Sequence, residues 1–203
     1  MSKKVFSLIC AVSCSLIWGS AFIAQDMGMD YNGPFTFTFG RLFLGFLTLV
    51  PFLIIYEYKK IKPLIFKAQN IYNFLLIGFL LSMGNALQQF ALLYTDVANT
   101  AVFTIFYVVL VPFVSYYFFS KFIHNSVWLA IIICLFGGIL LTEFDNIQVR
   151  IGDSIAVVNA LFWAFHIVFI SRFLKVFNFP ITIACVQCLI ASFFALLPAL
   201  VFE

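Results

Sequence analysis

The sequence predicts an all-α fold, that of a polytopic helical membrane protein with about seven transmembrane helices. Hydrophobic residues make up 65% of its 203 residues, charged residues make up 9%, and the mean hydropathy is +1.13. A soluble domain carries roughly 25% charged residues, so this chain cannot form a water-facing surface. Its apolar runs are long and continuous, which excludes a transmembrane barrel, whose strands alternate apolar and polar residues.

Each span is bounded by residues typical of loops. A spanning helix needs roughly 20 mostly apolar residues, and windows of this size predict spans at 5–25, 34–56, 71–93, 98–120, 126–142, 152–171 and 180–202. A Gly-Pro pair opens the second span, and a basic run at 57–67 precedes the third. A Thr-Asp pair makes a tight turn into the fourth, and polar residues at 124–126 and 143–146 flank the short fifth span.

Lysine and arginine are distributed unevenly between the loops, and this bias sets the expected orientation. One side holds Lys3, Lys4, Lys59, Lys60, Lys62, Lys67, Lys121, Arg172 and Lys175. The other holds Arg150 together with Asp26, Asp30, Asp96, Glu143, Asp145 and Asp153. We therefore expect a multi-pass protein of the cell (inner, cytoplasmic) membrane with a cytoplasmic N-terminus. The lipid bilayer is an expected partner and nucleic acid is not, because the basic residues do not gather on one face.

The chain contains two copies of one pattern, offset by about 146 residues. The landmarks are Trp18, Pro34, Arg41 and Pro51 in the first copy, and Trp163, Pro180, Gln187 and Pro198 in the second. Equivalent points are five spans apart, and since five is odd the second copy must cross the membrane in the opposite direction. The sequence thus predicts a five-helix inverted repeat over 1–146 and the first two helices of an incomplete second copy over 147–203. Inverted repeats are typical of secondary transporters, whose substrate path lies between the halves near the midplane.

Stretches along the whole chain carry a family resemblance: IWGSAFIAQD…GPFTFTFGRLFLGFLTLVP, LLYTDVANTAVFTIFYVVLVPFVSYYFF, GGILLT and GDSIAVVNALFWAFHIVFISRF. In combination they resemble EamA-type members of the drug/metabolite transporter superfamily. The resemblance implies ten helices in two inverted halves, cytoplasmic termini, and transport of small metabolites. About three helices are missing from that pattern, so we expect a truncated chain. The first span also lacks the proton-coupling glutamate of related four-helix exporters, so coupling by that route is not expected.

Arg41 is the charged residue of the second predicted span. An ionised side chain in the bilayer costs at least a few kcal/mol and indicates a functional site. The span begins at Pro34, which puts Arg41 roughly 10 Å deep at 1.5 Å per residue. Two interpretations stay open. Arg41 either snorkels outward or ties helix ends together, through carbonyls or Asp26 and Asp30, or it lines the outer mouth of a cavity and meets an anionic substrate group.

Other polar and aromatic side chains inside the spans are candidates for the same cavity. The amides of Asn85, Gln88 and Gln89 lie together on the third span, where they would bind a polar substrate or hydrogen-bond between helices. Trp18 and Trp163 occupy equivalent repeat positions and would form aromatic walls. His166, one turn from Trp163, would relay protons or pack as a neutral ring. The remaining candidates are Gln25, Asn159 and Gln187.

The expected function is secondary transport of small metabolites, amino-acid-like or drug-like compounds, across the cytoplasmic membrane by alternating access. The alternative is a truncated, transport-incompetent fragment that needs a partner, a second chain or a homodimer, to supply missing helices. An enzyme is not expected, because the spans contain no nucleophile–base pair or paired carboxylates. Cys185 and Cys188 form an isolated C-x-x-C pair within an apolar run, so no metal or cofactor is expected.

Overall fold

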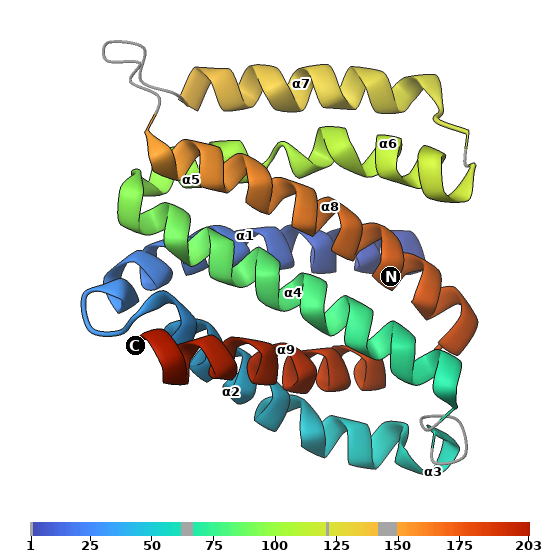
Figure 1. The fold of residues 1–203 in the computed structure, drawn as a ribbon. Coiled ribbons are helices and arrows are strands. Elements are labelled where there is room, and N and C mark those ends of the chain that lie inside the picture. Colours follow the sequence, from blue (N-terminus) through green and yellow to red (C-terminus); the bar gives the residue numbers. More distant parts are fainter. Residues whose placement is uncertain (1, 62–66, 121, 142–149) are drawn as a thin grey trace.

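The computed structural model describes residues 2–61, 67–120, 122–141 and 150–203, and these residues form an all-α bundle without strands (Figure 1). The helices are α1 (Lys3–Met29), α2 (Pro34–Tyr56), α3 (Tyr58–Ile61), α4 (Ala68–Tyr94), α5 (Val97–Thr104), α6 (Tyr107–Phe119), α7 (Asn125–Leu141), α8 (Ile151–Phe177) and α9 (Pro180–Phe202). The all-α prediction is therefore confirmed.

Within the described residues, six helical segments are long and apolar enough to cross a membrane: α1, α2, α4, α5 with α6, α8 and α9. The fifth expected span corresponds to α7, a shorter apolar helix. The sixth extends beyond its predicted end at 171 and reaches Phe177. The flexible side chains of Arg172 and Lys175 can reach the polar interface while their backbone continues the helix.

The fourth span is two helices rather than the single helix predicted over 98–120. The Phe106 N–H donates to the Phe103 carbonyl at 3.2 Å, and the Val108 N–H donates to the Ile105 carbonyl at 2.9 Å. This three-residue spacing interrupts the α-helical pattern. Pro112, the residue whose presence predicted a kink in this span, lies within α6. The break therefore precedes the proline in the sequence and does not coincide with it.

α2 and α9 run antiparallel and lie side by side, with α4 against both α8 and α9 (Figure 1). At the end of α2, the Glu57 carboxylate accepts from the backbone N–H groups of Ile181 at 3.2 Å and Thr182 at 2.7 Å. At the end of α9, the Glu203 carboxylate accepts from Phe35 at 2.8 Å and Thr36 at 2.7 Å. Each helix thus satisfies the free N–H groups that begin the other.

This reciprocal capping is the relation that two inverted copies would produce. α2 and α9 both have 23 residues and begin with proline, and α1 and α8 both have 27. The division of the chain at residue 146 stays a prediction.

Glu57→Gln is expected to destabilise the fold, because Glu57 is buried and also accepts from the Thr182 hydroxyl at 2.6 Å. An amide has one acceptor oxygen where the carboxylate has two, so we expect the free energy of unfolding to fall by about 1–3 kcal/mol. Thermal unfolding in detergent, followed by circular dichroism, measures the change. The control is Lys60→Gln on exposed α3, which should shift stability by less than about 0.5 kcal/mol. Equal losses in both variants would contradict the capping role.

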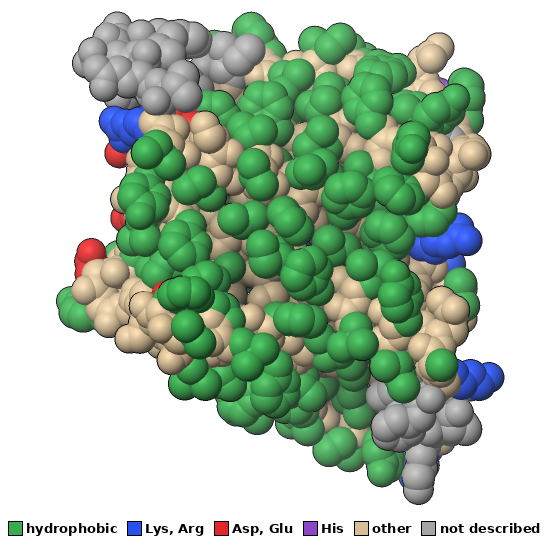
Figure 2. Space-filling model, viewed as in Figure 1, with side chains coloured by type: hydrophobic (Ala, Val, Ile, Leu, Met, Phe, Trp, Pro, Cys, Tyr) green, Lys and Arg blue, Asp and Glu red, His purple; other side chains and the backbone are tan. Residues whose placement is uncertain are grey.

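Apart from Arg41, the described charges divide between the two ends of the bundle (Figure 2). We name each end by the charge that is in excess there. The basic end holds Lys4, Lys59, Lys60, Lys67, Arg172 and Lys175, with Glu57. The acidic end holds Asp26, Asp30, Asp96, Asp153 and Glu203, with Arg150. The surface between them is largely hydrophobic, and exposed side chains such as Leu44 and Leu197 suit contact with lipid tails. The protein is therefore a multi-pass membrane protein in contact with the bilayer.

The core changes character along the bundle. At the basic end it is apolar and aromatic, where Phe74 of α4 packs edge-to-face on Phe173 and Phe177 of α8, with centroid distances of 4.9 and 5.4 Å. Toward the acidic end, α4 buries the amides of Asn85 and Gln88 instead. The buried amides of α4 therefore lie in the part of the bundle that is nearer the acidic end.

Candidate functional site

Arg41 reaches from α2 across to α4. Its Nη2 donates to the Asn85 side-chain oxygen, and the Asn85 amide donates in turn to the Leu81 carbonyl at 2.7 Å. The guanidinium also lies 5.8 Å from the centroid of the Phe37 ring, within range of a cation–π attraction. Arg41 Nε is buried and has no hydrogen-bond partner among the described residues.

No carboxylate neutralises Arg41 among the described residues. The ion pair found there joins Arg150 to Asp96, whose side chains are 47% and 66% exposed. Arg41 instead contacts the neutral amide of Asn85. The link to Asp26 or Asp30, one of the alternatives that the sequence left open, is therefore not formed in the described contacts.

Two further amides of α4 contact α1. The Gln88 amide donates to the Gln25 side-chain oxygen at 2.8 Å, and the Gln89 amide donates to the Met29 sulfur at 3.3 Å. Gln25, Gln88 and Gln89 are all at most 2% exposed. The amide side chains of α4 thus form hydrogen bonds with residues of both α1 and α2. We call Gln25, Arg41, Asn85, Gln88 and Gln89 the polar strip.

A second polar group lies between α5 and α8. The Asn159 amide donates to the Thr104 hydroxyl at 3.2 Å, and Thr104 is the last residue before the break in the fourth span. Thr100, one turn earlier, is fully buried. The sequence analysis identified Asn159 but missed both threonines. Their spacing of four residues on one helix face was a signal that could have found them.

Trp18 and Trp163, which were predicted to form aromatic walls, are in contact with ring centroids 5.2 Å apart. Trp18 also stacks on Tyr107 of α6 at 6.5 Å, a residue that the sequence analysis missed. Trp163 lies edge-on to His166 at 5.8 Å. His166 Nε2 is 3.0 Å from the Gln187 side-chain oxygen, so these two candidates form one hydrogen-bonded pair between α8 and α9.

The polar strip and the Thr–Asn group adjoin through Trp163, whose ring packs against Gly84 of α4. Buried side-chain atoms without a hydrogen-bond partner in the described structure are Thr38 Oγ1, Arg41 Nε, Gln88 Oε1, Gln89 Oε1, Thr100 Oγ1, Asn159 Oδ1 and Trp163 Nε1. Buried polar groups in proteins are nearly always paired. This set offers donors and acceptors together, which suits bound water or a small polar ligand.

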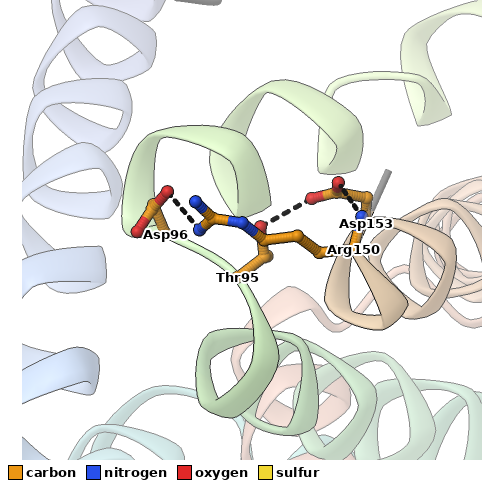
Figure 3. A network of polar contacts seen from close by, with 4 residues as sticks. All are labelled: Thr95, Asp96, Arg150 and Asp153. Carbon is orange, nitrogen blue, oxygen red and sulfur yellow. Dashed lines mark hydrogen bonds and ion pairs between the residues drawn. The ribbon is translucent and has the colours of Figure 1, made fainter. Parts of the chain in front are cut away.

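A further network, drawn in Figure 3, lies at the acidic end. The Thr95 hydroxyl donates to Asp153 at 2.6 Å, and Asp153 accepts from the Arg150 backbone N–H at 2.9 Å. The Arg150 side chain reaches Asp96. These contacts join the α4–α5 connection to the start of α8, beside a surface cavity of about 620 Å³ that Asp26 also lines.

Comparisons with known proteins agree with this architecture. The model of the EamA-like transporter family matches residues 5–143. An uncharacterized transporter of Archaeoglobus fulgidus is 27% identical over 176 residues, which cover 87% of this chain and 52% of the relative. The chain thus spans about half the length of this curated relative. No solved structure matches the chain. With a helical bundle able to span a membrane and a family match over most of its length, the chain belongs to the EamA-like transporter family.

Proposed function

We propose that this chain acts in secondary transport of small, carboxylate-bearing, amino-acid-like metabolites across the cytoplasmic membrane. The observation that carries the proposal is the Arg41 guanidinium, which lies among apolar helices with no carboxylate partner in the described residues. Such a charge is costly in a membrane, and a substrate carboxylate would offset that cost while the substrate is bound. Arginine suits this role because its planar group pairs with a carboxylate through two hydrogen bonds.

The neighbouring groups would recognise the rest of the substrate. The unpartnered oxygens of Gln88 and Gln89 are acceptors for an ammonium or hydroxyl group. The rings of Trp18, Trp163 and Tyr107 offer an apolar wall of the kind that holds a hydrocarbon side chain. Within this proposal His166 and Gln187 lie on the basic side of the wall, where they would meet the substrate after it passes.

Alternating access would arise from movement of the two inverted copies about this site. The reciprocal caps of α2 and α9 support a rigid antiparallel pair. The break between α5 and α6 supports a hinge, because a short stretch of tighter turns within a span can absorb bending. The basic end would face the cytoplasm, by the distribution of lysine and arginine.

One observation favours the alternative that the chain needs a partner for transport. Buried residues make up 6% of the apolar window of α1 but 39% of that of α8, its counterpart in the repeat. A second chain, or another copy of this one, would then cover α1 and complete the path. On this alternative the chain alone binds substrate and does not transport it.

Binding and transport are therefore tested separately. In a Trp128→Phe background, emission from Trp18 and Trp163 reports on the proposed site. Leucine and leucinamide, which differ in the carboxylate, form the matched probe pair. We expect leucine to change the emission with saturation and leucinamide to have little effect, and counterflow of labelled leucine in proteoliposomes then measures transport. Binding without counterflow supports the partner alternative, whereas equal responses to the acid and the amide would contradict carboxylate recognition.

A further inference from the structure

A second cavity lies at the basic end, between α4, α6 and α8, with a volume of about 380 Å³. Its polar side is formed by Gln69 and Asn73 in the first turns of α4 and by Arg172 near the end of α8. Its apolar side includes Phe169 and Phe173. The cavity is thus amphipathic, and it lies where the helices leave the apolar part of the bundle.

This cavity is separate from the proposed substrate site. Asn73 and Asn85 are both on α4, twelve residues apart, which corresponds to about 18 Å along the helix axis. The apolar cluster of Phe74, Phe173 and Phe177 packs at the level of the cavity rather than at the level of the polar strip. A ligand in this cavity would therefore not contact Arg41.

Arg172 is held in place at the mouth of the cavity. Its guanidinium carbon lies 4.4 Å from the centroid of the Phe119 ring of α6, a close cation–π arrangement. Lys67, just before α4, adds positive charge at this end. The acidic side chain described there, Glu57, already accepts hydrogen bonds from the start of α9. The mouth of the cavity therefore carries an excess of positive charge.

From this geometry we infer that the cavity binds an anionic phospholipid of the adjacent leaflet. The lipid phosphate accepts hydrogen bonds from Arg172 and from the amides of Gln69 and Asn73, since arginine pairs well with phosphate oxygens. The first part of an acyl chain lies against Phe169 and Phe173. Basic pockets between transmembrane helices on the cytoplasmic side are suited to such headgroups. The assignment to that leaflet rests on the orientation proposed above, whereas the binding itself depends on neither orientation nor transport.

The aromatic floor of the cavity commits the site to lipid rather than to a soluble anion. The aromatic floor would remain exposed to water under a bare phosphate, whereas an acyl chain covers it. Tyr72, on the rim of the same cavity and 63% exposed, has the amphipathic ring that gathers at membrane interfaces. The cavity thus has polar side chains for the lipid headgroup and aromatic side chains for the acyl chain.

Native mass spectrometry of the detergent-solubilised chain tests the inference. The probes are phosphatidylglycerol and phosphatidylethanolamine with identical acyl chains. We expect wild type to retain phosphatidylglycerol preferentially, and Arg172→Gln to weaken its binding about tenfold, as for loss of a hydrogen bond between charged groups. Lys175→Gln is the matched control, because it removes the same charge from the same helix end without lining the cavity. It should change binding less than about twofold.

A second variant keeps all the charges. Leu76→Trp adds bulk to the cavity, which Leu76 lines, and should also weaken phosphatidylglycerol binding. Leu75→Trp adds the same bulk at a position 46% exposed on another face of α4 and should leave binding unchanged. Equal retention of the two lipids by wild type, equal losses in Arg172→Gln and Lys175→Gln, or displacement of the lipid by millimolar glycerol 3-phosphate would each overturn the inference.

Discussion

Arg41→Gln is expected to weaken binding of a carboxylate substrate by about ten- to a hundredfold, because a hydrogen bond between charged groups contributes about 1.5–3 kcal/mol. The same change should leave the stability of the fold unchanged or slightly higher. The reason is that glutamine removes a charge whose burial in the membrane is costly, while the contact to Asn85 is with a neutral amide. Glutamine is also the residue, Gln187, that the predicted repeat aligns with Arg41.

The two interpretations of Arg41 predict opposite outcomes in the same pair of measurements. If Arg41 binds substrate, tryptophan emission titrated with leucine shows a weaker affinity and thermal unfolding is unaltered. If it only ties α2 to α4, the variant unfolds at a lower temperature and the remaining folded protein binds leucine normally. Thermal unfolding by circular dichroism and the fluorescence titration together separate these cases.

Arg150→Gln is the matched control for Arg41→Gln. Arg150 forms the exposed ion pair with Asp96 at the acidic end, and exposed pairs contribute about 0–1 kcal/mol. The control variant should therefore bind leucine nearly as wild type does. A comparable loss of affinity in both variants would point to long-range attraction of the substrate by positive charge rather than to contact with Arg41.

Gly152→Ala is expected to be the most destabilising of the glycine-to-alanine changes in α8 and α4. A Cβ atom at Gly152 would lie 2.7 Å from the Ala91 carbonyl oxygen and equally close to the backbone nitrogen of Thr95. These are backbone atoms of α4, which cannot rotate away as a side chain can. The two helices must therefore separate, at a cost of about 1–3 kcal/mol, and the bond from Thr95 to Asp153 is weakened with them.

The control is Gly40→Ala in α2, where an added Cβ would meet nothing within 4 Å. There the expected effect has the opposite sign, because alanine favours a helix over glycine by about 1 kcal/mol. Chemical unfolding in detergent, with wild type and both variants compared, measures the difference. Stabilisation of both variants would show that helix propensity alone decides the outcome and that close approach of α4 and α8 at Gly152 is unimportant.

Much of the architecture could be predicted from residue types alone. The spans follow from apolar runs long enough to cross a bilayer, where only a structure that pairs its own backbone groups is stable. Trp18 and Trp163 were identified as candidates from the sequence, and their rings are in contact. The partner of Arg41 was predicted less well, since the acidic side chains nearest in sequence, Asp26 and Asp30, do not contact it in the described structure.

The break after Thr104 and the ring of Tyr107 show what composition leaves open. No glycine or proline marks the break itself, and Thr104 is bound to Asn159 from a helix more than fifty residues away. The same is true of the caps, in which Glu57 and Glu203 each serve the other helix of the α2–α9 pair. These are contacts between helices. Each forms only when the two helices are positioned correctly relative to each other along their axes.

The sequence by itself determined the helical class, the order of the spans and the division of charge between the ends, because transfer into lipid depends on the summed polarity of each segment. The tertiary structure decided which polar groups meet and which remain unpaired. Arg41 meets Asn85, whereas the Gln88 side-chain oxygen has no partner within the part of the chain that the structure describes. Pairing of side chains requires distances fixed to a fraction of a helical turn. Close contacts such as that of Gly152 with α4 set those distances, and they exist only once the helices have packed.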